Sequence, residues 1–254
     1  MITYFIYIIA GLGAGIGTGL AGLSAAAVIS PMLITFLTFD PYEAVGIALA
    51  SDVLASAVSA YVYGKNKNLD IKNGMIMLIS VLCFTLIGSY LAKLMPMTTM
   101  GNFSVIMTTL LGMKFIVKPV MTTKEIQQNK TQKEKNIQSI ICGCIIGFIC
   151  GFIGAGGGMM LLLILTSVLQ YELKTAVGTS VFIMTFTALT GACSHFYLGG
   201  MPHMEALFVC MMTTFIGARI AALFANKAQP KTLNRATGIV LTVLGLAMIC
   251  VKYL

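Results

Sequence analysis

The sequence contains few charged residues. Asp, Glu, Lys and Arg make up 9% of its 254 residues, whereas 58% are hydrophobic. Soluble domains carry about 25% charged residues, so this composition excludes a water-soluble globular domain. Apolar runs of roughly 20 residues, the length that spans a bilayer as a helix, recur along the whole chain. The sequence therefore predicts an all-α polytopic membrane protein.

Several chemical motifs are also missing. There is no HExxH, no GxxxxGKS or GxxxxGKT and no GxSxG, so metalloproteases, P-loop ATPases and serine hydrolases lack their signatures. The seven cysteines form no CxxC pair and are interpreted as small apolar packing residues. The net charge of +8 comes with no RNA- or DNA-binding motif. We expect no cofactor, no metal and no nucleic-acid partner.

The N-terminus lacks the basic start and the small-residue cleavage site of a signal peptide, so we expect Met1 to begin the mature chain. Ten apolar segments follow, and Pro, Gly or polar residues separate them, as is typical of helix ends. Residues 1–117 are predicted to form a first membrane repeat, 118–138 a Lys-rich cytoplasmic linker and 139–254 a second repeat. The segments are Ile2–Leu23, Ala25–Phe39, Ala44–Tyr63, Gly74–Leu94, Thr99–Val117, Ser139–Gly154, Gly156–Leu169, Thr175–Leu198, Glu205–Phe224 and Ala236–Val251.

The two halves resemble one another at an offset of 132 residues. The shared residues include Gly22 with Gly154 and the triplet Ala-Val-Gly at residues 44–46 and 176–178. The second segment, Ala25–Phe39, would be only about 22 Å long as a helix, whereas the hydrocarbon core is roughly 30 Å thick. We expect the first pair of segments in each half to be short or broken at a Gly-rich turn. Whether these segments cross fully or are re-entrant stays open.

Basic residues indicate the relative orientation of the halves, because Lys and Arg concentrate in cytoplasmic loops. If each half has five segments and the second is inverted, 14 basic residues lie on the cytoplasmic side and 2 outside. Parallel halves would give 10 and 6, so two inverted-topology repeats are favoured. The cytoplasmic set is Lys65, Lys67, Lys72, Lys114, Lys118, Lys124, Lys130, Lys133, Lys135, Lys174, Arg219, Lys227, Lys231 and Arg235.

Inverted repeats with Gly-interrupted segments are typical of secondary transporters, whose sites lie near the midplane at the starts of half-helices. Free backbone N–H groups at a helix start favour an anion, and glycine allows it to approach. The alternative is that the glycines only allow close helix packing. The predicted anion-binding residues at the two breaks are Gly22, Ser24, Gly154, Gly156, Gly157 and Gly158.

The third segment of the first half adds a polar face. Asp52, Ser56, Ser59 and Tyr63 are spaced four, three and four residues apart, which places them on one side of a helix. Ser56 and Ser59 are candidate substrate contacts, with Tyr63 as an accessory residue. The register maps this face onto Met184, Ala188, Gly191 and His195, and we expect the two faces to be opposite walls of one cavity.

Asp52 lies well inside an apolar segment, where a carboxylate is costly and by default suggests function. It is a candidate carrier of a coupling proton, since losing its charge would favour anion entry. The alternative is a structural Asp bonded to a Ser or a backbone carbonyl. Thr179 and Ser180, directly after the second Ala-Val-Gly, are further candidate substrate contacts.

Two other polar residues are weaker candidates. Arg219 lies about five residues from the cytoplasmic end of its segment, where it can reach lipid phosphates or act as a cation at the inner mouth. His195, near the outer end of its segment, is a packing residue or an accessory proton group.

Several motifs together resemble the sulfite exporter TauE/SafE family, across nearly the whole chain. They are GFIGAGGG at residues 151–158, AVGTS at 176–180 and GARIAALF at 217–224. The resemblance implies a multi-pass permease for small sulfur-containing anions such as sulfite or organosulfonates. The first half departs from the pattern, with SAAA at residues 24–27 where the second half has GGGM, so the halves are expected to contribute unequally.

The sequence as a whole thus predicts a non-enzymatic secondary permease for a small anion, in the cytoplasmic membrane of a prokaryote. Its expected partners are the anionic substrate, the lipid bilayer and protons as the coupling ion, and a homo-oligomer is left open. The alternatives are a cation carrier that uses Asp52 and a membrane-embedded enzyme.

Overall fold

The computed structural model describes residues 2–92, 113, 117, 132–153, 157–199 and 201–253, and every regular element within these ranges is a helix. Four helices are long and apolar enough to cross a bilayer. They are α1 (Ile2–Ala21), α3 (Pro41–Lys65), α9 (Leu173–Gly199) and α10 (Met204–Lys227). The others are α2 (Ala26–Leu37), α4 (Ile71–Ala92), α7 (Gln132–Ile153), α8 (Gly157–Ser167) and α11 (Pro230–Tyr253). The predicted all-α polytopic membrane fold is confirmed.

Helix boundaries follow the Pro, Gly and polar punctuation of the sequence. α3, for example, begins at Pro41, whose missing N–H is tolerated in the first helical turn. The Asp40 carboxylate accepts a hydrogen bond from the Glu43 backbone N–H (3.2 Å) and so caps this helix. α7 begins at Gln132, within the range that the sequence assigns to the linker. The fifth predicted segment, apart from residues 113 and 117, lies outside the described residues.

The second helix of each half is short, as expected. α2 has 12 residues and α8 has 11, which correspond to about 18 and 16 Å of helix. Both are followed by a residue with a left-handed backbone, Thr38 (φ 54°) and Gln170 (φ 56°), which lie 132 positions apart. The next residues, Phe39 and Tyr171, each donate a backbone hydrogen bond to the carbonyl six positions earlier. The two short helices therefore end in the same way.

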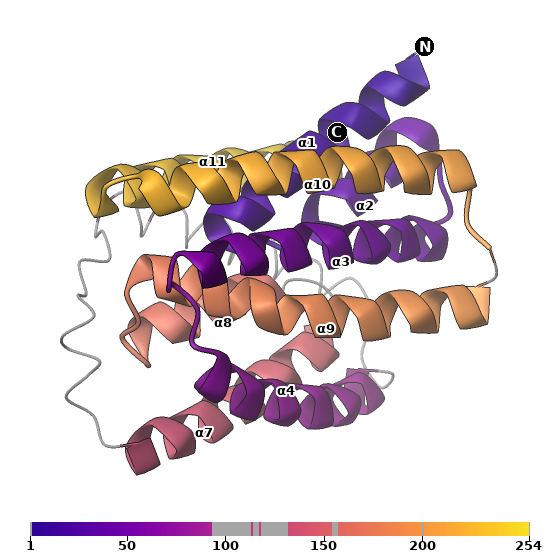
Figure 1. The fold of residues 1–254 in the computed structure, drawn as a ribbon. Helices are drawn as coiled ribbons and strands as arrows, with labels where there is room; N and C mark the ends of the chain where they lie inside the picture. Colours follow the sequence, from indigo (N-terminus) through magenta and orange to yellow (C-terminus); the bar gives the residue numbers. More distant parts are fainter. Residues whose placement is uncertain are drawn as a thin grey trace.

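α3 and α9 pack against each other at the centre of the molecule (Figure 1). Gly46, near the start of α3, lies against His195 near the end of α9. Gly178, near the start of α9, lies against Tyr63 near the end of α3. The two helices therefore run antiparallel.

On either side of this pair, the first helix of one half packs on the fourth helix of the other (Figure 1). α1 runs parallel to α10, with Gly11, Gly15 and Gly19 set against the backbone of α10 at residues 210, 214 and 218. α7 runs parallel to α4, with Gly143 and Gly147 set against the backbone at residues 77 and 81. The absence of a side chain at these glycines allows the helix backbones to approach closely.

The C-terminal ends of α1, α3 and α10 meet the N-terminal ends of α4, α9 and α11. Lys174 Nζ donates to the Asn226 carbonyl (2.9 Å), and Asn68 donates to the Asn226 side chain (2.7 Å). Thr237 of α11 donates to the carbonyl of Leu20 at the end of α1 (3.3 Å). The basic residues near these helix ends, Lys65, Lys67, Lys72, Lys174, Lys227, Lys231 and Arg235, therefore gather at one end of the molecule, which we call the cationic end.

Candidate functional site

Asp52 lies in the middle of α3 and is 1% exposed. Ser24, from the break between α1 and α2, donates its hydroxyl hydrogen to Asp52 Oδ2 (2.8 Å). Ser56, one turn further along α3, donates to Oδ1 (3.1 Å). The backbone N–H of Ala25 is a third donor to this carboxyl group. We call these four residues the Asp52 cluster.

The cluster places a negatively charged group at the N-terminus of α2. A helix start presents unpaired N–H groups and a partial positive charge, which stabilise an anion. Here the Asp52 side chain takes the place at which the sequence predicts a substrate anion. The Ser24 hydroxyl, predicted as a donor to substrate, donates to Asp52 instead. In this conformation the first break is therefore filled by an anion of the protein itself.

Gly22 gives the break its shape. Its φ of +62° is the left-handed conformation that glycine adopts readily and that other residues adopt only with strain. A Cβ atom at this position would overlap the Ser180 hydroxyl on α9. Ser180 is fully buried and donates to the Val177 carbonyl (2.8 Å). The structure thus brings Gly22 and Ser180 together, as two neighbours of the Asp52 cluster.

The start of α8 lies beside the first break. Gly158 is buried, and a Cβ atom there would overlap the carbonyl oxygen of Gly22 and the sulfur of Met184. Gly157, half-buried, begins α8. Gly154 and Gly156 lie outside the described residues. At an offset of 132 residues Met184 corresponds to Asp52, so α8 faces a neutral thioether where α2 faces a carboxylate.

The remaining polar candidates on α3 and α9 have separate surroundings. Thr179 is buried, and its hydroxyl accepts the backbone N–H of Asp70 at the start of α4 (3.2 Å). Tyr63 is buried and donates its hydroxyl hydrogen to the Gly19 carbonyl (2.9 Å), which ties the end of α3 to α1. The Ser59 hydroxyl is fully buried without a hydrogen-bond partner among the described residues.

His195 and Arg219 lie apart from the Asp52 cluster. His195 is half-buried and lies against Gly46, toward the end opposite to the cationic end. Arg219 is exposed on α10, where it lines a groove with residues of α3. Instead of lining two walls of one cavity, the faces of α3 and α9 pack directly at Leu49 and Gly191, where a Cβ atom on the glycine would be 3.0 Å from the leucine.

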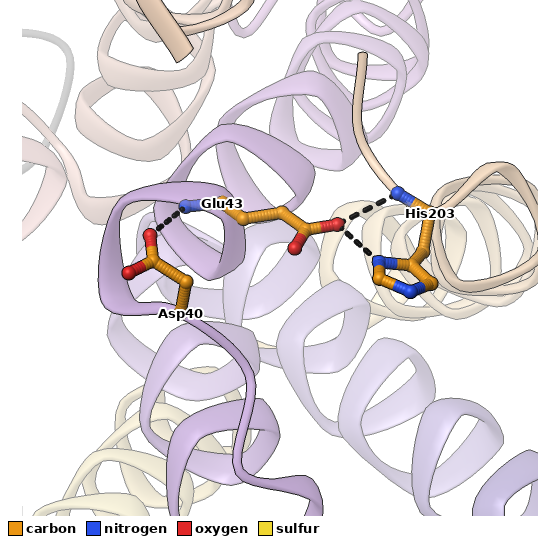
Figure 2. A network of polar contacts seen from close by, with 3 residues as sticks. All are labelled: Asp40, Glu43 and His203. Carbon is orange, nitrogen blue, oxygen red and sulfur yellow. Dashed lines mark hydrogen bonds and ion pairs between the residues drawn. The ribbon is translucent and has the colours of Figure 1, made fainter. Parts of the chain in front are cut away.

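The sequence analysis missed a polar contact at the end opposite to the cationic end. Figure 2 shows Glu43 of α3 accepting two hydrogen bonds from His203, one from the backbone N–H (2.7 Å) and one from Nδ1 (2.6 Å). Nearby, Tyr4 donates to Glu205 (2.9 Å). Glu43 and His203 are 160 positions apart, so no local pattern indicates that they meet. Within the described ranges, no group of three His, Cys, Asp or Glu side chains is arranged to hold a metal ion.

Comparison with known proteins places this architecture. The sequence profile described as "Sulfite exporter TauE/SafE" matches residues 7–248. The chain is 27% identical to the "probable membrane transporter protein YunE" of Bacillus subtilis, over 97% of each chain. It is also 27% identical to the "probable membrane transporter protein MJ0441" of Methanocaldococcus jannaschii, over 95% of this chain and 94% of that one. Matched over nearly its whole length, the chain belongs to the sulfite exporter TauE/SafE family and is a multi-pass membrane transporter.

Proposed function

We propose that this protein is a secondary permease that moves a small anion, sulfite or another sulfur oxyanion or organosulfonate, across the cytoplasmic membrane. Transport proceeds by alternating access between two inverted repeats and is coupled to protons through Asp52. The family description, which names sulfite, supports this substrate class. The observation that carries the proposal is the Asp52 carboxylate bound at the helix start of α2, beside the start of α8.

The two helix starts take different anions in this proposal. At α2 the tethered carboxylate of Asp52 accepts the hydrogen bonds from Ser24 and Ser56. At α8 the register supplies Met184, which carries no charge, so the N–H groups of that helix start are left to the substrate. Gly157 and Gly158 let the substrate approach the backbone, and Ser180 is the nearest hydroxyl on α9.

Protonation of Asp52 links the two starts. An ionised carboxylate repels a second anion, and the repulsion is strong where water is scarce. When Asp52 takes up a proton, the repulsion ends and the Ser24 hydroxyl is released to bind the substrate. The substrate anion and the proton are therefore bound together and cross in the same direction.

Alternating access is supported by a repeated set of helix contacts. Gly11 and Gly15 face residues 210 and 214, whereas Gly143 and Gly147, 132 positions later, face residues 77 and 81. The facing residues are themselves 133 positions apart. Each half thus offers the other the same pair of surfaces, as a two-fold relation between repeats requires.

The direction of the equivalent helices supports inversion. α3 and α9 hold the same place in the two repeats and run antiparallel, as the paired contacts of Gly46 with His195 and of Gly178 with Tyr63 indicate. A two-fold axis in the plane of the membrane produces this arrangement. The excess of Lys and Arg at the cationic end assigns that end to the cytoplasm.

The donors around Asp52 favour the anion permease over a cation carrier. All three described partners of the carboxyl group, two hydroxyls and one backbone N–H, donate to it. Such a donor set stabilises negative charge at this position, and a cation would have to displace it.

Uptake of labelled sulfite into proteoliposomes tests the proposal, with thiosulfate, sulfate and sulfoacetate as competitors. We expect saturable uptake that sulfoacetate competes and that an inward proton gradient accelerates. Asp52→Asn should abolish the response to the gradient, because the amide cannot exchange a proton at this site. Ser56→Ala, which removes one donor and keeps the carboxylate, is the matched control and should keep the response.

Three results would count against the proposal. Absence of uptake by folded, inserted protein would remove the sulfur substrate class. Asp52→Asn protein that still responds to the gradient would remove the coupling role. Uptake of a cation that is lost in Asp52→Asn and unaffected by Gly158→Leu would instead support the cation carrier.

A further inference from the structure

A groove with a volume of about 300 Å³ lies between α3 and α10 near the cationic end. Two cations, Lys65 of α3 and Arg219 of α10, line it together with Asn66. The rest of its lining is apolar or aromatic and includes Val58, Tyr61 and Leu223. The groove is separate from the Asp52 cluster, which is buried on another face of α3.

Arg219 is placed unusually for a charged residue in a membrane span. It precedes Lys227, at the end of α10, by eight residues, or about 12 Å of helix. Large apolar side chains are exposed around it, among them Ile216, Ile220 and Phe224, so this surface faces lipid. A cation at this depth is costly unless an anion neutralises it.

The protein itself supplies no such anion in the part of the chain that the structure describes, where neither Arg219 nor Lys65 is paired with an acidic side chain. Tyr61 is 70% exposed beside these cations, and exposed tyrosine is enriched where the hydrocarbon meets the lipid headgroups. The groove therefore combines unneutralised positive charge with an apolar surface at headgroup depth.

The other half of the sequence lacks these cations. In the register of the proposed repeats, the position of Lys65 corresponds to Tyr197 and that of Arg219 to Leu86. The equivalent groove would lie between α9 and α4, toward the outer side. Packing between these helices therefore does not require cations, and their presence at the cytoplasmic copy alone has to be explained by a ligand on that side.

We propose that this groove binds the headgroup of an anionic phospholipid from the cytoplasmic leaflet. Arg219 and Lys65 hold the lipid phosphate, and an acyl chain lies along the apolar surface of α3 and α10. Basic pockets between membrane helices on the cytoplasmic side are suited to such headgroups. A free phosphate would leave the apolar lining uncovered.

Native mass spectrometry of the purified full-length protein tests this site, independently of transport. The probes are phosphatidylglycerol, phosphatidylcholine, inorganic phosphate and glycerol 3-phosphate. We expect one phosphatidylglycerol to remain bound preferentially. The double substitution Lys65→Gln and Arg219→Gln should weaken its binding roughly 30-fold, at about fivefold for each cation near an anionic lipid.

The matched control is Lys72→Gln with Arg235→Gln, which removes the same charge from the cationic end but outside the groove. It should bind phosphatidylglycerol as the unaltered protein does. An equal loss in this control would overturn the proposal in favour of general charge attraction. Saturable binding of inorganic phosphate or glycerol 3-phosphate that competes with the lipid would overturn it in favour of a soluble anion. Unchanged thermal unfolding in phosphatidylcholine establishes that both variants fold.

Discussion

At the scale of single residues, the structure shows how a carboxylate is held inside a membrane span. A buried charge persists only when hydrogen bonds or opposite charges replace the water that it loses. Ser24, Ser56 and the start of α2 provide those hydrogen bonds to Asp52. The same contacts make Asp52 sensitive to the position of α2, because Ser24 and Ala25 would leave it if the break moved.

Gly22 is predicted to tolerate no side chain, for two separable reasons. Gly22→Ala places a Cβ atom in a left-handed backbone, at a cost of about 1–2 kcal/mol, and against the Ser180 hydroxyl, at a further cost of about 1–3 kcal/mol. We expect a lower midpoint of thermal unfolding in detergent. A thiol-reactive dye can report it, because Cys142 and Cys210 are buried until the protein unfolds.

The double variant Gly22→Ala with Ser180→Ala separates the two costs. Removing the hydroxyl relieves the overlap and leaves the backbone strain, so the double variant should recover part of the lost stability. The Ser180 Cβ atom would be 3.5 Å from the new methyl group, an ordinary contact. Full recovery, or none, would show that one of the two costs has been misassigned.

At the scale of the elements, glycines set the distance between helices. The helix α1 uses Gly11, Gly15 and Gly19, four residues apart, to bring its backbone against α10. Gly143 and Gly147 do the same between α7 and α4. Small residues at such interfaces are a common means of close packing in membranes, where apolar side chains gain little by leaving the lipid.

Gly15→Ala and Gly147→Ala are predicted to destabilise the protein by similar amounts, about 1–3 kcal/mol each. In each variant the new Cβ atom would overlap a backbone carbonyl oxygen, of Thr214 or Val81. Gly13→Ala is the control on α1, because its Cβ atom would have one neighbour, Val28, at 3.8 Å. It should leave stability unchanged or raise it slightly, since alanine favours helix. The measurement is the unfolding midpoint with the thiol-reactive dye, and an equal loss in Gly13→Ala would contradict the account.

The elements themselves could be predicted from the sequence. The predicted segment Ala44–Tyr63 became α3 at Pro41–Lys65, because length and apolar composition define a membrane span directly. The contacts could not be predicted so well. Ser24 and Asp52 are 28 positions apart, and Glu43 and His203 are 160 apart, so their meeting depends on helix packing that local patterns do not encode. The sequence analysis expected Ser24 to serve a substrate and could not see that Asp52 would accept its hydrogen bond.

At the scale of the whole molecule, charge separates the two ends. Lys and Arg dominate the cationic end, whereas Asp40, Glu43 and Glu205 gather with His203 at the other. At that other end, Glu43 from the first half accepts two hydrogen bonds from His203 of the second (Figure 2). This contact joins the two halves at the end that the charge distribution assigns to the outside.

Epitope insertion tests the inverted arrangement in the full-length chain. One tag follows Lys67, in the connection between α3 and α4, and the other follows Met201, in the equivalent connection between α9 and α10. We expect antibody to reach the second tag in intact cells and the first only after permeabilisation. Two tags accessible from the same side would mean parallel halves and would contradict the proposed repeats. Retained sulfite uptake by the tagged proteins serves as the control for folding.

The pairing of α1 with α10 has a consequence for biosynthesis. α1 emerges first from the ribosome, but the helix that covers its glycine face is made about 200 residues later: Tyr7 and Cys210, which face each other, are 203 positions apart. At roughly 5–20 residues per second, α1 waits about 10–40 s in the bilayer before its partner arrives. During that interval its exposed glycines can pair with other helices. A chaperone or the insertion machinery that shields α1 would therefore raise the yield of correctly assembled protein, and a truncated first half made alone would be a substrate for membrane proteases.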